Sequence, residues 1–123
     1  MIRSDKKRVI IVTGASRGLG REIALCFGRA GERIVVNYLS NEQAARTVAN
    51  EISWIGGESI CYKADVKSPV EVDAMTRDTV ESWGAVDVLI NNAALTKDGI
   101  MLSMTEEYWD DVVDTNLSGP FRC

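Results

Sequence analysis

Three glycines follow an apolar run near the start of the chain, in the stretch IIVTGASRGLG at residues 10–20. They are Gly14, Gly18 and Gly20, in the spacing GxxxGxG. Glycine permits a tight turn after a strand and lets backbone amides approach a pyrophosphate at the positive end of the following helix. The stretch therefore predicts a loop that binds a dinucleotide through its phosphates. A plain glycine-rich turn between a strand and a helix is the alternative.

The residues around the next predicted strand indicate which dinucleotide would bind. An acid about 20 residues beyond the glycines would bind the ribose 2′-hydroxyl of NAD and repel a 2′-phosphate. Residues 33–41 read RIVVNYLSN and contain no acid. Arg17 in the glycine loop could pair with a phosphate dianion, and Ser40 could donate a hydroxyl. These residues predict NADP(H), unless Arg17 is only a solvated surface side chain.

Composition excludes several other kinds of chemistry. The sequence has no histidine, which removes Ser-His-Asp and Cys-His catalysis and the commonest zinc ligand, so we expect no metal site. The three cysteines are odd in number and form no CxxC pair, which favours a reducing cytoplasm. The net charge is −4, and the basic cluster at 6–8 has no interleaved aromatic residue. No stretch is typical of a signal peptide or a membrane span. We therefore expect a soluble cytoplasmic protein that binds neither nucleic acid nor membrane.

The hydrophobic pattern predicts strands that alternate with helices. Short aliphatic runs are typical of parallel strands buried on both faces, and apolar residues at helical spacing lie between them. The clearest helix start is at Ser68, Pro69 and Glu71, which supply an N-cap, a first-turn proline and a glutamate at the third position. Ser40 and Gln43 have the spacing of a capping box for the preceding helix. The predicted strands are 8–12, 33–37, 59–63 and 86–91, and the predicted helices are 17–29, 40–55, 68–83 and one that begins near 105.

The helical spacing also predicts which side chains face the sheet. The predicted inner residues are Leu19, Ile23, Phe27 and Ala30 in the first helix, Ala45, Val48, Ile52 and Ile55 in the second, and Val72, Met75, Thr79 and Trp83 in the third.

Strands and helices that alternate through short connections predict a doubly wound parallel sheet with helices on both faces. We expect residues 1–123 to form one α/β domain of Rossmann type, with about four βα units. Ligands of such sheets bind beyond the carboxyl ends of the strands. The loops after the four strands are therefore the predicted site.

Four motifs occur in order along this pattern: TGASRGLG at 13–20, Asp65-Val66, NNAA at 91–94 and DTNLSG at 114–119. With them the chain resembles the short-chain dehydrogenase/reductase family, and residues 91–121 look most like its 3-oxoacyl-[acyl-carrier-protein] reductases. The resemblance implies NADPH-dependent reduction of a β-keto thioester to the 3-hydroxy form. It also implies a homo-oligomer, a tetramer or a dimer, for the complete enzyme.

The resemblance implies a role for each matching position. Asp65 and the backbone of Val66 would recognise the adenine edge, although Asp65 could instead be a turn residue. Asn92 and Ala93 would line the ribose and nicotinamide side, or the asparagine could satisfy buried loop amides. Asn116 matches the catalytic asparagine that supports a proton relay, with a structural role as the alternative. The pyrophosphate would contact Gly14, Ser16, Gly18, Leu19 and Gly20, and the 2′-phosphate would lie near Arg17, Tyr38 and Ser40.

The chain departs from the family pattern in two ways. Ala94 replaces the usual glycine of NNAG, and no tyrosine has a lysine four residues on, as the family's YxxxK pair requires. The family's catalytic serine has no match either. We interpret the chain as the N-terminal, cofactor-binding half of a reductase, inactive by itself. A non-catalytic NADP-binding or complementation module is the second hypothesis, and a plain α/β interaction domain is the third.

Overall fold

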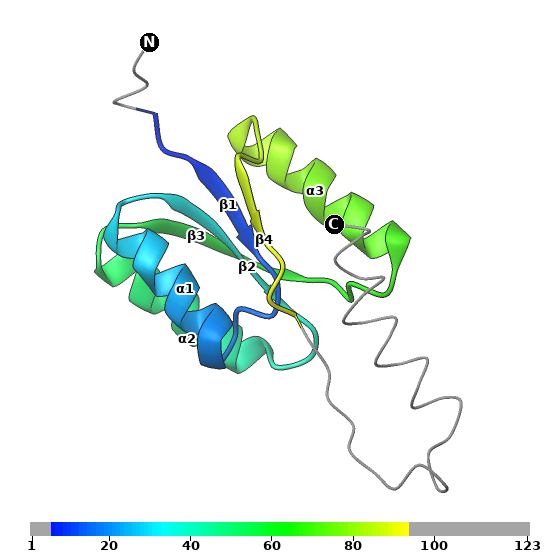
Figure 1. The fold of residues 1–123 in the computed structure, drawn as a ribbon, viewed down its shortest axis with the longest axis horizontal. Helices are drawn as coiled ribbons and strands as arrows, with labels where there is room; N and C mark the ends of the chain where they lie inside the picture. Colours follow the sequence, from blue (N-terminus) through cyan, green and yellow to red (C-terminus); the bar gives the residue numbers. More distant parts are fainter. Residues whose placement is uncertain (1–5, 94–123) are drawn as a thin grey trace, which may run out of the picture.

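A computed structural model of the protein describes residues 6–93. This part of the chain forms a four-stranded sheet with helices on both faces (Figure 1). The strand order is β3-β2-β1-β4, and every neighbouring pair is parallel. The elements are β1 (Val9–Val12), α1 (Gly18–Arg29), β2 (Arg33–Tyr38), α2 (Glu42–Trp54), β3 (Glu58–Lys63), α3 (Pro69–Trp83) and β4 (Val88–Ile90).

The two central strands, β1 and β2, are almost wholly buried, and each contains an aliphatic run, at 9–12 and at 34–36. A parallel strand that is covered on both faces needs such a continuous apolar run. Val12 pairs with Val36 on one side and with Ile90 on the other. Strands β1 and β4 therefore end level with each other, and β2 continues past them to Tyr38, so the loops that follow the three strands start at one edge of the sheet. Asn37 is the buried polar residue of β2, and it is 2% exposed.

Alternate residues of a strand point to opposite faces of a sheet, and both faces are covered here. Ile10 and Ile34 pack in the cluster that includes the buried residues of α1 and α2. Ile11 and Val35 pack on the other face with Met75 of α3. The predicted doubly wound α/β fold is confirmed.

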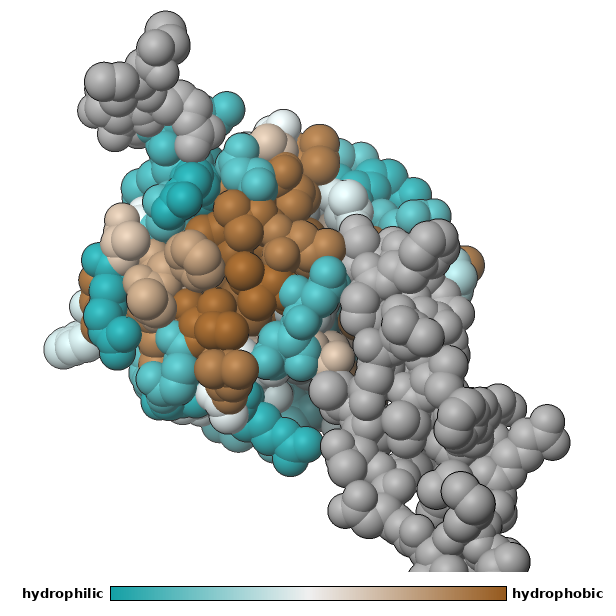
Figure 2. Space-filling view, in the orientation of Figure 1, coloured by the Kyte–Doolittle hydropathy of each residue, from teal (hydrophilic) through white to brown (hydrophobic). Residues whose placement is uncertain are grey.

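The β4 side of the sheet leaves apolar side chains only half-buried. Val88 and Ile90 of β4 and Ile23 and Phe27 of α1 lie at the margin of the same cluster. Figure 2 shows an apolar area on this face, between α1 and β4 as they are placed in Figure 1. Residues 6–93 therefore cover this edge of the sheet incompletely.

The start and the end that the sequence predicts for α3 are confirmed. Oγ of Ser68 accepts the N–H of Glu71 at 3.3 Å, and Pro69 is the first helical residue. Gly84 ends the helix with φ 86°, a left-handed conformation that favours glycine. A serine N-cap and a glycine C-cap therefore fix both ends of the helix.

Replacing Ser68 with alanine removes this N-cap, so we expect the free energy of unfolding to fall by about 1 kcal/mol. Urea denaturation followed by circular dichroism measures the change. Ser68→Asp is the matched control, because an aspartate also caps a helix and its charge favours the N-terminus. The control should stay close to wild-type stability, and an equal loss in both variants would show that capping is not the cause.

The predicted inner face of α1 is wrong in part. Leu19 is 70% exposed and Ala30 is exposed, whereas both were predicted to face the sheet. The helix approaches α2 through small residues, since a Cβ on Gly28 would lie 3.2 Å from the side chain of Ile52. The spacing of the large apolar residues therefore did not predict the buried face of α1, which is determined by its close packing against α2. The buried residues of α1 are Gly20, Ala24, Leu25 and Gly28.

Helix α2 begins one residue later than the capping box predicts. Its N-cap is Asn41, whose Oδ1 accepts the N–H of Ala44 at 3.0 Å. Asparagine and serine cap helices about equally well, so spacing alone could not choose between Ser40 and Asn41. Ile55 was predicted to face inward, but it is the C-cap and is 37% exposed.

None of the helices described in residues 6–93 has the length and the apolar character that a membrane span requires.

Candidate functional site

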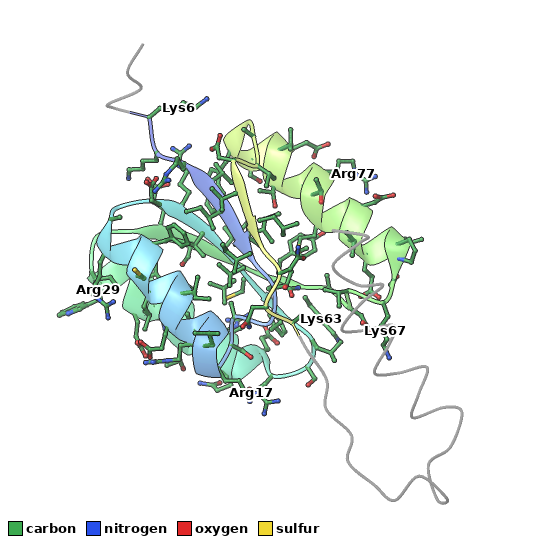
Figure 3. All side chains as sticks on the ribbon, in the orientation of Figure 1. Lys6, Arg17, Arg29, Lys63, Lys67 and Arg77 are labelled. Carbon is green, nitrogen blue, oxygen red and sulfur yellow. The ribbon has the colours of Figure 1, made fainter. Side chains whose placement is uncertain are left out.

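A pocket of about 570 Å³ lies at the carboxyl ends of the strands, where the site was predicted. Its walls come from the loops that follow all four strands. Figure 3 shows Arg17 and Lys67 at this end of the molecule, away from Lys6 at the opposite end. The predicted cofactor residues that line the pocket are Gly14, Ser16, Arg17, Gly18, Ser40, Asp65, Val66, Asn92 and Ala93.

Five residues of the pocket wall were not among the predicted cofactor residues. Leu39 is 57% exposed and Ala64 is buried, so together they offer an apolar surface beside the polar loop. Asn37 gave a usable signal, because it is a polar residue inside an apolar strand. Leu39 gave none, because a lone leucine after a strand is more often part of the core. The missed residues are Asn37, Leu39, Asn41, Ala64 and Lys67.

Three predicted cofactor residues do not line the pocket. Tyr38 is 8% exposed and packs in the core cluster on the α1–α2 face, and this burial raises the pKa of its phenol. Leu19 points its side chain to solvent, and Gly20 is buried beneath the loop. Asn116, like Ala94, lies outside the described residues.

The glycines shape the turn from β1 into α1. Gly14 and Gly18 have φ of 61° and 58°, values that residues with a Cβ rarely adopt. A Cβ on Gly14 would also lie 2.9 Å from Cα of Ala93. A Cβ on Gly20 would lie 2.4 Å from Nδ2 of Asn92. The glycines therefore turn the chain and also let the loops after β1 and β4 pack closely.

Helix α1 begins at the pocket wall, at Gly18, with N–H groups that have no helical acceptor. Its N-cap, Arg17, makes no side-chain capping bond, and the first turn carries no acid. The first helical bond runs from the N–H of Arg21 to the carbonyl of Arg17 at 3.2 Å. The N–H groups of Gly18, Leu19 and Gly20 precede that bond and have no helical acceptor. Such a helix start favours an anion through both its donors and its dipole.

Thr13 and Asn92 tie the loop after β4 to the glycine loop. Oγ1 of Thr13 accepts the N–H groups of Asn92 and Ala93, each at 3.0 Å. Nδ2 of Asn92 donates to the carbonyls of Thr13 and Gly14, each at 3.1 Å. Both amide hydrogens of Asn92 are therefore used within the protein. These contacts support the structural role that the sequence left open for this residue.

Asp65 has the contacts of a turn residue and also lines the pocket. Its Oδ1 accepts the N–H of Lys67 at 2.9 Å, and its carbonyl accepts the N–H of Ser68 at 2.9 Å. A carboxylate has two oxygens with about four acceptor sites, so this turn leaves acceptor capacity. The turn role and a role at the pocket are compatible.

The charges of the pocket favour an anionic ligand. Arg17 and Lys67 are the cations of its wall, and Asp65 is the acid. No acid within residues 6–93 forms an ion pair with Arg17, whereas Arg21 pairs with Glu51 of α2 at 2.7 Å. Arg17 can therefore offer its guanidinium to a ligand without breaking a contact in the described part of the chain.

Comparisons with known proteins agree with this geometry. Residues 8–123 match the family model described as short chain dehydrogenase. The chain belongs to this family. It is 47% identical over 113 residues to the 3-oxoacyl-[acyl-carrier-protein] reductase FabG of Staphylococcus epidermidis, a match that covers 92% of this chain and 46% of that protein. A reductase of the same name from Synechocystis is 43% identical over 116 residues, covering 94% and 47%.

Solved structures of short-chain dehydrogenases share the fold of the chain. A short chain dehydrogenase from Mycobacterium avium superposes with a TM-score of 0.88 at 36% identity, over 95% of this chain and 44% of that chain. A protein described as a short-chain alcohol dehydrogenase from Sinorhizobium meliloti gives 0.88 at 32% identity, over 97% and 47%. The predicted family is confirmed. The chain spans about half the length of the curated relatives it matches.

Proposed function

We propose that the pocket binds NADP(H) and that the complete protein is an NADPH-dependent reductase of 3-oxoacyl thioesters. The observation that carries the proposal is the pairing of an uncapped helix start with Arg17, which has no acid partner among residues 6–93. The end of β2 adds no carboxylate to oppose a 2′-phosphate. An acid there would favour NAD instead.

The residues present fit the parts of this coenzyme. We assign the pyrophosphate to the N–H groups at the start of α1, including that of Leu19, and the 2′-phosphate to Arg17 and Ser40. The apolar wall at Leu39 suits an adenine ring, with Asp65 and the backbone of Val66 at its edge. The ribose and nicotinamide side would lie along the loop at 91–93. The predicted proximity of Tyr38 to the 2′-phosphate stays a prediction, and Gly20 would act through packing.

When bound, a reduced nicotinamide supplies a hydride to a carbonyl carbon. The described residues would bind and orient the coenzyme. Asn116 keeps the supporting role in a proton relay that the family resemblance implies. The sequence has no YxxxK pair, so we expect the 123-residue chain to bind the coenzyme without turnover.

The substrate and setting are proposals that the relatives support. The matched reductases are named for 3-oxoacyl groups on acyl carrier protein, so we propose an acyl-carrier-linked or related small thioester. The complete enzyme would be a homo-oligomer, a tetramer or a dimer. We place the protein in the cytoplasm, since Cys26 and Cys61 are free thiols. Neither nucleic acid nor membrane is a proposed partner.

Calorimetric titration of the 123-residue chain with NADPH and with NADH tests the proposal, alongside an assay of acetoacetyl thioester reduction. We expect NADPH to bind more tightly than NADH, with no turnover by this chain. A cooperative thermal transition in the same preparation shows that the chain is folded. A folded chain that binds neither coenzyme would support a plain interaction domain and would overturn the proposal.

A further inference from the structure

We infer that Asn37 is a positioning residue for the coenzyme, because its side-chain amide holds the glycine loop and the loop after β3 in a fixed relative position. This inference rests on the proposed NADP(H) function. Asn37 lies near the end of β2, between the two loops, and is itself part of the pocket wall.

The side-chain amide of Asn37 makes three of the connections. Oδ1 of Asn37 accepts the N–H of Gly14 at 3.1 Å. Its Nδ2 donates to the carbonyl of Tyr62 at 3.2 Å and to that of Ala64 at 3.1 Å. An asparagine amide has two donor hydrogens and one acceptor oxygen, and each of these three is used.

The backbone of Asn37 adds a fourth connection. Its carbonyl accepts the N–H of Ala15 at 2.9 Å. The N–H groups of Gly14 and Ala15 are thus both committed to Asn37. A phosphate must therefore find its donors farther along, toward the start of α1. Asn37 therefore determines which backbone N–H groups of the glycine loop stay available to the ligand.

The amide is the group that the position requires. Asn37 is 2% exposed, so any bonding group left unpaired there would be costly. An aspartate could still accept from Gly14, but it could not donate to two carbonyls. An apolar side chain would leave the N–H of Gly14 and both carbonyls without this partner. Both loops that the amide joins contribute to the pocket wall through Gly14 and Ala64.

The affinities for two ligands distinguish a role of Asn37 in positioning the loops from a role in stabilising the fold alone. In the proposed arrangement, 2′-phospho-ADP-ribose engages both loops, because it carries the pyrophosphate and the adenine. Adenosine 2′-monophosphate lacks the pyrophosphate and depends less on the spacing of the loops. We compare Asn37→Ala with wild type for both ligands by calorimetry, well below the unfolding temperature of each protein.

We expect Asn37→Ala to bind 2′-phospho-ADP-ribose about tenfold or more weakly, since one lost buried bond is worth about that factor. The loss for adenosine 2′-monophosphate should be about threefold or less. Hydrogen exchange should show faster exchange at the N–H of Gly14 without any ligand. If Asn37→Ala does not fold, Asn37→Thr is tested instead, because threonine keeps a donor and an acceptor. We expect this variant also to lose more affinity for 2′-phospho-ADP-ribose than for adenosine 2′-monophosphate.

Thr79→Val is the matched control. Thr79 is 0% exposed and donates to the carbonyl of Met75 at 2.7 Å, on α3 and outside the pocket wall. The control should lose thermal stability but keep both affinities. Parallel losses for the two ligands in the Asn37 variants, or equal losses in Thr79→Val, would overturn the inference alone. Failure of the wild-type chain to bind 2′-phospho-ADP-ribose would overturn the proposed function and, with it, this inference.

Discussion

Replacing Gly20 with alanine is expected to weaken NADPH binding by at least about tenfold and to lower the free energy of unfolding by about 1–3 kcal/mol. A Cβ at this position would lie 2.4 Å from Nδ2 of Asn92 and 2.4 Å from the carbonyl oxygen of Gly14. The second of these atoms belongs to the backbone, so the start of α1 must move away from the glycine loop. The move also disturbs the bonds from Asn92 to Thr13 and Gly14.

Urea denaturation and NADPH titration of the Gly20→Ala variant measure the two effects. Gly84→Ala is the matched control, because a Cβ there meets nothing within 4 Å and the position lies at the end of α3. Its φ of 86° disfavours alanine, so the control should lose stability and keep its affinity. If Gly20→Ala binds NADPH as tightly as the wild type, the site does not require the close packing of the loops after β1 and β4.

Replacing Arg17 with alanine is expected to weaken NADPH binding by about ten- to a hundredfold and to leave NADH binding nearly unchanged. The reason is that the 2′-phosphate, which NADH lacks, would be the partner of this guanidinium. Arg17 lines the pocket and has no ion pair with an acid among residues 6–93. Its removal therefore breaks no salt bridge in the described structure. Calorimetric titration with both coenzymes gives the two ratios.

Arg29→Ala is the matched control for charge. Arg29 ends the same helix, about 18 Å from its start by the helical rise, and the Debye length at physiological salt is about 8 Å. The control should leave both affinities unchanged. Equal weakening of NADPH and NADH by Arg17→Ala would assign the arginine to a group that both coenzymes share, and NADP(H) selectivity would need another explanation.

The sequence predicted the elements and their order well because local patterns determine them. Strands β1, β2 and β4 each contain an aliphatic run, and Ser68 and Gly84 mark the ends of α3 by their chemistry alone. The glycine loop was also predictable, since the spacing after a strand implies a turn at a helix start. The family motifs then placed most of the pocket wall.

The features of the fold and the site that the sequence did not predict depend on contacts between residues that are distant along the chain. The close approach of Gly28 to Ile52 decides which face of α1 is buried, and helical periodicity carries no record of that contact. The burial of Tyr38 also depends on such contacts, since its ring packs in the core cluster with residues of α1 and α2. Asn37 was visible as a polar residue in an apolar strand, but its contacts were not predictable, because its partners at 62 and 64 belong to another strand end.

Amide chemical-shift mapping of the isotope-labelled 123-residue chain with NADPH tests whether the start of α1 holds the coenzyme phosphates. We expect the largest changes at the N–H groups of Gly18 and Leu19, with a second group at residues 64–67. Changes confined to the outer groove between α1 and α2, around Trp54, would contradict it, and so would a folded chain whose spectrum does not respond.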